Sequence, residues 1–278
     1  MHARAPAPAL PHKVYFDSAG SGSPTVVFLS GWGAEAADWI EVFDTVAKKT
    51  RACVYDRYGV GLTAQYGSAM PRRARDAKDQ ARELEQLLHN ADIPKPYVLV
   101  GHSWGGALVR LYAATHDDVQ AVVFVDSASP GQDTALTAAL PPKKPGESAV
   151  LTQLRDPTLN KPLQRPEYLA FHQSLQEVGA AGALGEVPIV VITAGTTFGD
   201  ATTLLYPTWS RLQNRIARLS SRTVHVLATT SGHFVQVDNP ELTEAAIAAA
   251  VGAVRDDGRL ASCAALFRGV NGARCLSG

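Results

Sequence analysis

The sequence lacks an excess of charge of either sign. It contains 26 Lys and Arg residues against 26 Asp and Glu residues, so its formal net charge is zero at pH 7. A surface without a field of one sign gathers neither nucleic acid nor an anionic membrane. We therefore expect a small-molecule partner rather than a nucleic acid.

Long apolar runs are also missing. No run approaches the roughly 20 residues that span a bilayer, so we expect no membrane span. The first residues, MHARAPAPALPHK, are polar and Pro-rich and contain no apolar core of a signal peptide, which predicts a cytoplasmic location by default. With 46% hydrophobic and 19% charged residues, the chain has a globular rather than a disordered composition.

Cysteines are scarce, and the three present are too few for a disulfide scaffold. Cys53 lies in an apolar run and is expected to be a buried thiol. Cys263 and Cys275 lie near the C-terminus, and their spacing alone does not decide whether they pair. A disulfide between them would indicate an oxidising compartment and a secreted chain in its mature form. Both locations stay open at this point.

Short apolar runs alternate with helical patterns along the chain. This alternation favours a mainly parallel sheet with helices on both faces, and the Val-rich runs without polar alternation are typical of strands covered on both sides. The expected strands are Val14–Asp17, Thr25–Ser30, Arg51–Asp56, Tyr97–His102, Gln120–Asp126, Pro188–Ala194 and Thr223–Thr229.

The helical patterns divide the rest of the chain. Residues 73–91 carry apolar side chains at helical spacing, and Asn239-Pro240 is a typical start for a helix that runs to about Val254. Residues 129–187 show no strand pattern and many prolines, which predicts a cap of short helices inserted between two strands. We expect one domain over residues 1–278, with this cap and a tail at about 255–278.

The most informative segment is Gly101-His102-Ser103-Trp104-Gly105, which matches the pattern G-x-S-x-G. An apolar strand precedes it and a helical run follows it, as the strand-turn-helix context of a nucleophilic serine requires. Such a tight turn strains the backbone and lifts the Ser103 hydroxyl above the sheet. We interpret the neighbouring His102 as a packing and hydrogen-bonding residue.

With this elbow, the chain resembles the α/β-hydrolase superfamily, and in particular bacterial esterase-like members with a helical cap. The resemblance covers residues 14–254 and includes Ser30-Gly31-Trp32-Gly33, the stretch from Tyr55 to Gly61, and Ser231-Gly232-His233-Phe234. It implies an α/β-hydrolase fold, with a mainly parallel twisted sheet of about eight strands. It also implies a Ser-His-acid triad in that chain order.

The resemblance assigns the general base to His233 but leaves two candidates for the acid. Asp126 ends the strand after the elbow, 23 residues beyond Ser103, where some branches of the superfamily place the acid. Asp200 follows the next strand, the commoner location, but four residues separate it from Gly195, where the family pattern has two. We prefer Asp126 and keep Asp200 as the alternative.

An acyl-transfer site also needs backbone N–H donors for the oxyanion. By resemblance these are the N–H groups of Trp32 and Trp104, and the substrate pocket is expected to include Gly31, Trp32, Trp104 and Phe234. We interpret Asp56 and Arg57 as an ion pair that fixes its loop.

These residues predict a serine hydrolase that cleaves a carboxylic ester or a related apolar acyl compound. An amidase or aminopeptidase, a lactonase and a C–C hydrolase would use the same triad, and a non-catalytic or slow-turnover receptor would also keep it. Ser103 excludes chemistry that needs an Asp nucleophile. No metal-ligand cluster or nucleotide-binding motif is present in the sequence, so we expect neither a metal nor a cofactor. The sequence does not indicate the oligomeric state.

Overall fold

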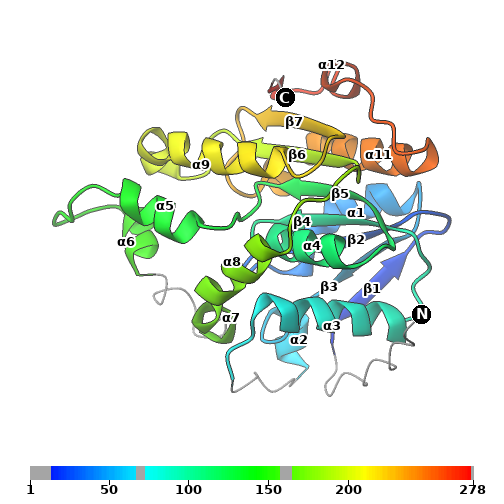
Figure 1. Cartoon of the computed structure of the whole chain (residues 1–278), viewed down its shortest axis with the longest axis horizontal. Coiled ribbons are helices and arrows are strands. Elements are labelled where there is room, and N and C mark those ends of the chain that lie inside the picture. The colour runs from blue at the N-terminus through cyan, green and yellow to red at the C-terminus, as the bar shows by residue number, and fades with distance from the viewer. Residues whose placement is uncertain (1–13, 67–72, 157–164, 277–278) are drawn as a thin grey trace.

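The computed structural model describes residues 14–66, 73–156 and 165–276, which build an eight-stranded sheet in the order β1-β3-β2-β4-β5-β6-β7-β8 (Figure 1). The six strands from β2 to β7 run parallel, and β1 and β8 are antiparallel at the edges. The predicted mainly parallel sheet is therefore confirmed. The strands are β1 (Phe16–Ala19), β2 (Thr25–Leu29), β3 (Ala52–Tyr55), β4 (Tyr97–His102), β5 (Val119–Val125), β6 (Ile189–Ala194), β7 (Thr223–Ala228) and β8 (Ala273–Cys275).

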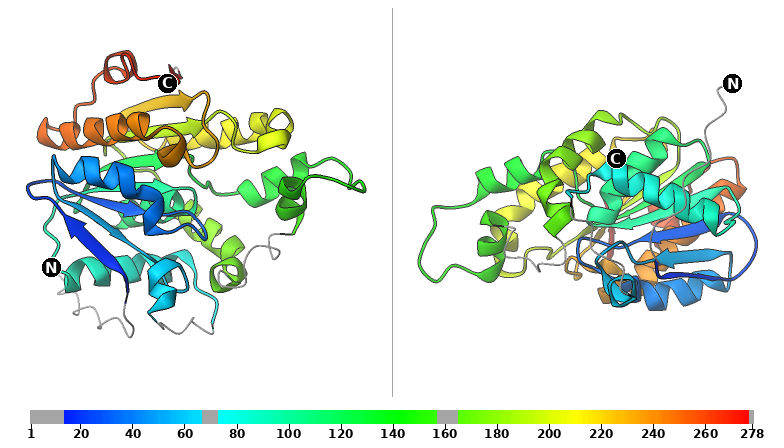
Figure 2. Two further views of the ribbon diagram at one scale, coloured as in Figure 1. Left: turned by 180° about the vertical axis from the view of Figure 1, so that it is seen from behind. Right: turned by 90° about the horizontal axis from the view of Figure 1, so that it is seen from below.

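Helices cover both faces of the sheet, as the unbroken apolar runs predicted. On one face, α1 (Ile40–Ala47) and α11 (Pro240–Arg255) lie side by side (Figure 2, left). On the other face lie α3 (Ala77–Asn90), α4 (Trp104–Thr115) and the end of α9 (Thr202–Ala217). Each face thus has its own apolar core, and the central strands are buried between them.

Hydrogen-bonding side chains set the starts of helices α3 and α11. Asp76 accepts a hydrogen bond from the backbone N–H of Asp79, so α3 begins at Ala77 and not at Arg73 as the apolar pattern suggested. Asn239 caps α11 in the same way through the N–H of Leu242, with Pro240 in the first position, as predicted.

Four short helices connect β5 to β6 and gather where the parallel strands end, on the left of Figure 1. They match the absence of strand patterns in this stretch, of which residues 157–164 lie outside the described part. They are α5 (Gln132–Ala139), α6 (Ala149–Arg155), α7 (Arg165–Leu169) and α8 (Phe171–Ala180). The remaining short elements are η1 (Ala36–Trp39), α2 (Gly61–Gln65), η4 (Gly199–Ala201), α10 (Val235–Asp238) and α12 (Cys263–Leu266). Within the described ranges, none of the helices combines the length and the apolarity needed to cross a membrane.

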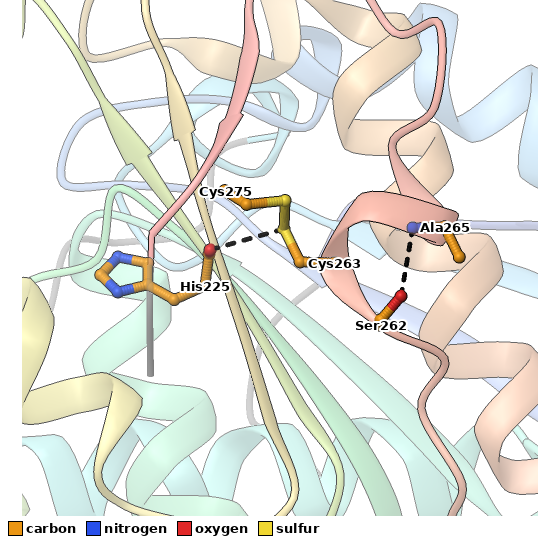
Figure 3. The surroundings of a disulfide bond; sticks show 5 residues. All are labelled: His225, Ser262, Cys263, Ala265 and Cys275. Atoms are coloured by element: carbon orange, nitrogen blue, oxygen red, sulfur yellow. Dashed lines mark hydrogen bonds between the residues drawn. A yellow bond between two sulfur atoms is a disulfide. The ribbon is translucent and has the colours of Figure 1, made fainter.

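The tail folds back onto the sheet and is held by a disulfide between Cys263 and Cys275 (Figure 3). The disulfide joins the start of α12 to β8, a strand that the sequence did not predict. Beyond β7, the backbone N–H of Thr229 donates to the carbonyl of Gly272 at 2.8 Å. The tail therefore supports the segment that leads toward His233. Cys53 is a free buried thiol, as expected, and burial raises its pKa.

We expect the double variant Cys263→Ser/Cys275→Ser to be less stable than the wild type. Closing a loop of this size is worth about 3 kcal/mol in the chain-entropy model. For a domain of this size that corresponds to a loss of roughly 5–10 °C in Tm, measured by calorimetry. The control is Cys53→Ser in the same assay without reductant, followed by addition of a reductant to each protein. If the Tm of the wild type does not change with the reductant and equals that of the double variant, the disulfide between Cys263 and Cys275 is contradicted.

Candidate active site

Ser103 stands at a sharp turn between β4 and α4. Its φ is 50° and its ψ is −118°, a conformation that a residue with a side chain adopts only when its surroundings impose it. The backbone N–H groups of Gly106 and Ala128 donate to its carbonyl at 3.0 and 2.8 Å and hold the turn. The side chain is half-buried, so the hydroxyl remains within reach of a ligand.

The two glycines of the G-x-S-x-G pattern are required by close backbone contacts. A Cβ on Gly101 would lie 2.5 Å from the carbonyl oxygen of Gly105. A Cβ on Gly105 would collide with the carbonyl oxygen of Leu29 in the neighbouring strand β2. The turn can therefore approach β2 only without side chains at these positions.

His233 and Asp126 meet across the end of the sheet. The Nδ1–H of His233 donates to Oδ2 of Asp126 at 2.7 Å, which leaves Nε2 as the free acceptor of the neutral ring. Asp126 is fully buried directly after β5, and the His233 side chain is 29% exposed in the loop between β7 and α10. The alternative acid, Asp200, lies exposed on η4.

Asp126 accepts three further hydrogen bonds, so each of its oxygens receives two. The backbone N–H of Ala194 and the indole Nε1–H of Trp209 donate to Oδ1 at 3.0 and 2.7 Å. The Thr197 hydroxyl donates to Oδ2 at 2.6 Å. These donors stabilise the ionised carboxylate in a buried position. Trp209 and Thr197 were missed by the sequence analysis, because nothing in the local sequence marks a residue of α9 or of the loop after β6 as a partner of a distant carboxylate.

The residue before the serine contacts the His233 loop. His102 is buried, and its Nε2–H donates to the backbone carbonyl of His233 at 2.8 Å. The two rings lie 4.7 Å apart, and Phe234 packs on His102 at 4.8 Å. This is the packing and hydrogen-bonding position that was predicted for His102. Asp238 fastens the same loop by accepting the N–H of Gly232 at 2.7 Å.

The loop after β2 lies against Ser103. A Cβ on Gly31 would lie 3.0 Å from the Cβ of Ser103, so the Gly31 backbone packs directly on the serine. The N–H of Trp32 follows in this loop, and the N–H of Trp104 stands in the first turn of α4, where a helix has no internal acceptor. The two predicted oxyanion donors thus belong to segments on either side of Ser103.

The expected ion pair between Asp56 and Arg57 is corrected by the structure. Asp56 accepts the backbone N–H groups of Ala36 and Leu62, at 2.6 and 2.8 Å. Arg57 instead donates its Nε–H to Glu167 of α7 at 2.9 Å, and both side chains are buried. Each residue still fixes a loop, but the partner of Arg57 is a carboxylate 110 positions away that the sequence did not single out.

Aromatic side chains form an apolar wall along the loop that carries Trp32 and the start of α4. Phe171 of α8 stacks on Trp32 with ring centroids 6.0 Å apart and contacts Trp104 at 5.5 Å. The Trp104 indole is buried and donates to Gln80 of α3 at 3.0 Å. Phe234 is 41% exposed next to His233. Helix α8 therefore places an apolar side chain over the loop that carries Trp32.

A strand-turn-helix serine, a His–Asp pair and a helical cap on a mainly parallel sheet define a protein class. A family model described as the alpha/beta hydrolase family matches residues 26–246. The chain therefore belongs to the α/β-hydrolase family, which confirms the resemblance drawn from the sequence and the expected fold class.

Individual relatives are more distant. An uncharacterized protein of Bacillus subtilis, YqjL, is 27% identical over 230 residues, which cover 82% of this chain and 83% of that protein. A pimeloyl-[acyl-carrier protein] methyl ester esterase of Vibrio atlanticus is 31% identical over 117 residues, 42% of this chain and 41% of the esterase. The solved structure of a thermophilic esterase from Thermogutta terrifontis matches with a TM-score of 0.64 and 18% identity, covering 90% of this chain and 97% of that one.

The buried His102 predicts a pH dependence of stability. Burial, reinforced by the neighbouring His233, lowers the pKa of His102 well below its ordinary value of 6.5. The unfolded chain therefore binds a proton that the folded chain excludes once the pH falls below about 6.5, and the free energy of unfolding decreases as the pH falls. We expect His102→Gln to flatten this slope by up to about 1.4 kcal/mol per pH unit in urea titrations between pH 7.5 and 5.

Other titrating groups, carboxylates included, also contribute to this slope, so a matched histidine variant is needed as a control. His89 is exposed near the end of α3, and His89→Gln is expected to leave the slope of the wild type unchanged. Equal slopes for the wild type and both variants would show that His102 does not stay neutral in the folded protein.

Proposed function

We propose that the protein is a serine hydrolase that cleaves carboxylic esters through an acyl-enzyme, with Ser103 as nucleophile, His233 as general base and Asp126 as the orienting acid. The observation that carries the proposal is the 2.7 Å hydrogen bond from Nδ1 of His233 to the buried Asp126, beside a serine held in strained backbone geometry. Without a base a serine hydroxyl is a weak nucleophile, and this pair supplies one.

In the proposed reaction, the Ser103 oxygen attacks the ester carbonyl while Nε2 of His233 takes the hydroxyl proton. Asp126 holds the ring in the tautomer that leaves Nε2 unprotonated, and it stabilises the imidazolium that forms. The negative charge that develops on the carbonyl oxygen is bound by the N–H groups of Trp32 and Trp104. His233 then returns its proton to the leaving alkoxide, which departs as the alcohol.

Deacylation repeats these steps with water. His233 takes a proton from the water molecule as its oxygen attacks the acyl carbon, and the second tetrahedral intermediate collapses to release the carboxylic acid and to reprotonate Ser103. The same oxyanion donors serve both half-reactions. The partial exposure of the His233 side chain supports access of water to its ring.

The acyl group is proposed to be apolar. Phe171 stacks on Trp32 in the loop that packs on Ser103, and Phe234, 41% exposed beside His233, adds further aromatic surface. Contact with such a surface favours a hydrocarbon chain by roughly 0.8 kcal/mol for each buried methylene group. The esterase among the relatives supports ester chemistry but covers less than half of this chain.

The test is a fluorophosphonate probe with peptide mass spectrometry, combined with turnover of p-nitrophenyl acetate, butyrate and octanoate. We expect the label on Ser103, loss of label and turnover in Ser103→Ala, and a rise of kcat/KM from acetate to butyrate because of the apolar wall. Turnover that persists in Ser103→Ala would place the chemistry elsewhere. A folded wild type that takes no label would argue for a receptor.

The choice of acid is tested by Asp126→Asn against Asp200→Asn. An amide at position 126 presents an N–H where His233 Nδ1–H needs an acceptor, so it favours the wrong tautomer. We expect kcat to fall by about 10⁴-fold, the effect of this substitution in a Ser-His-Asp triad. Asp200→Asn, on the exposed turn, is expected to stay within about twofold of the wild type, since surface changes have small effects. The reverse pattern would assign the acid to Asp200.

A further inference from the structure

Arg57 makes a set of buried hydrogen bonds that have no part in the proposed triad. It follows β3, is 5% exposed, and donates to two successive backbone carbonyls of the loop that packs on Ser103. Its Nη1–H and Nη2–H groups donate to the carbonyls of Ser30 and Gly31 at 2.7 and 2.8 Å. Its Nε–H donates to Glu167, so the planar fork of the guanidinium is shared between the loop and the cap.

The carbonyl of Gly31 and the N–H of Trp32 belong to the same peptide unit. A peptide unit is planar, and in the trans form its C=O and N–H point in opposite directions. A side chain that fixes the carbonyl therefore also fixes the direction of the N–H. A charged donor on the carbonyl further polarises the unit, because hydrogen bonds in series strengthen one another in a buried site.

We infer that Arg57 is a positioning residue that orients and polarises the Gly31–Trp32 peptide as an oxyanion donor, and that Glu167 of the cap holds Arg57 in place for this task. The inference rests on the proposed function, because it assigns the oxyanion role to the N–H of Trp32. The inference adds that one of the two proposed oxyanion donors, the N–H of Trp32, depends on the carboxylate of Glu167 in the cap.

The energetics of burial favour a role beyond filling space. A buried guanidinium is costly unless it is fully hydrogen-bonded and paired with an anion, and an apolar side chain would often pack there at no loss. Burial opposes the charge on Arg57, but the carboxylate of Glu167 overcomes this and raises the pKa of Arg57 above its ordinary value. The guanidinium thus remains a cation beside the loop.

A second buried arginine provides a matched control. Arg75 is 1% exposed, forms an ion pair with Glu83, and lies 3.8 Å from the same Glu167 carboxylate. Its backbone N–H also donates to the carbonyl of Pro166, which fastens the start of α7. The side-chain contacts that the structure gives for Arg75 are with these carboxylates and with the Tyr58 ring, whereas those of Arg57 include the loop carbonyls.

The experiment compares Arg57→Met, Arg57→Lys, Glu167→Gln and Arg75→Met in the full chain. The readouts are kcat and KM with p-nitrophenyl butyrate, the rate of fluorophosphonate labelling of Ser103, and Tm. Removing a whole oxyanion donor lowers kcat by about 10²–10³-fold. In Arg57→Met the N–H of Trp32 is still present, but its orientation is no longer fixed. For Arg57→Met we therefore expect kcat and the labelling rate to fall by about 10- to 100-fold, with KM changed by less than about threefold.

The other variants separate positioning from stability. Arg57→Lys keeps a cation near the carbonyls but not the planar fork, so it should retain part of the activity that Arg57→Met loses. Glu167→Gln should lower kcat less than Arg57→Met, because Arg57 itself remains. Arg75→Met should lower Tm as Arg57→Met does, but keep kcat within about threefold of the wild type. If Arg57→Met fails to fold, the comparison of Arg57→Lys with Arg75→Lys takes its place.

Two kinds of failure are distinguishable. A wild type that neither takes the label nor turns over esters overturns the proposed function, and the oxyanion role of Arg57 with it. An active wild type with unchanged kcat in the Arg57 variants overturns this inference alone. It is equally overturned if Arg75→Met loses kcat in parallel with Arg57→Met, since both would then act through the stability of the cap.

Discussion

The buried carboxylate of Asp126 is the group on which the geometry of the site depends. An ionised carboxylate without solvent is tolerated only when hydrogen-bond donors surround it, and here four donors come from four different segments. They bring β6, the loop after it, helix α9 and the His233 loop to one point. The backbone N–H of Asp126 donates to the carbonyl of Ile192 at 2.8 Å, so the pairing of β5 with β6 sets the position of the carboxylate itself.

The cap is joined to both sides of the site by different means. On the side of the proposed acid, Trp209 donates to Asp126 and also lies in an apolar cluster with Leu136 of α5 and Leu205 of α9. On the side of the proposed oxyanion loop, the connection is ionic and runs from Glu167 of α7 to Arg57. A ligand that displaces cap helices would therefore act on the proposed acid through packing and on the proposed oxyanion loop through charge.

The sequence predicted those features whose signals are local. Val-rich runs gave the parallel strands, the glycines around Ser103 marked the turn, and the position of His233 before a capped helix marked the candidate base. The sequence left two candidates for the acid because the surroundings of Asp126 depend on Trp209, 83 residues away, and on the register of β6. The partner of Arg57 was missed for the same reason. Strand β8 was not predicted because it is short and mostly exposed and has no apolar pattern.

The proposed nucleophile and the proposed acid both stand at strand ends, in strained backbone conformations. Ser103 and Asp126 have φ values of 50° and 41°, conformations that cost about 1–3 kcal/mol each. They follow His102 and Val125, which are paired in the register of β4 and β5, so the two strained residues leave the sheet side by side. The hydrogen bonds between the neighbouring strands offset this strain energy. The distance between Ser103 and Asp126 is therefore set by the geometry of the sheet. The described cap helices contact the oxyanion-loop side of the site through the side chains of Glu167 and Phe171. A change of Phe171 can therefore alter the ligand that fits without moving the proposed triad.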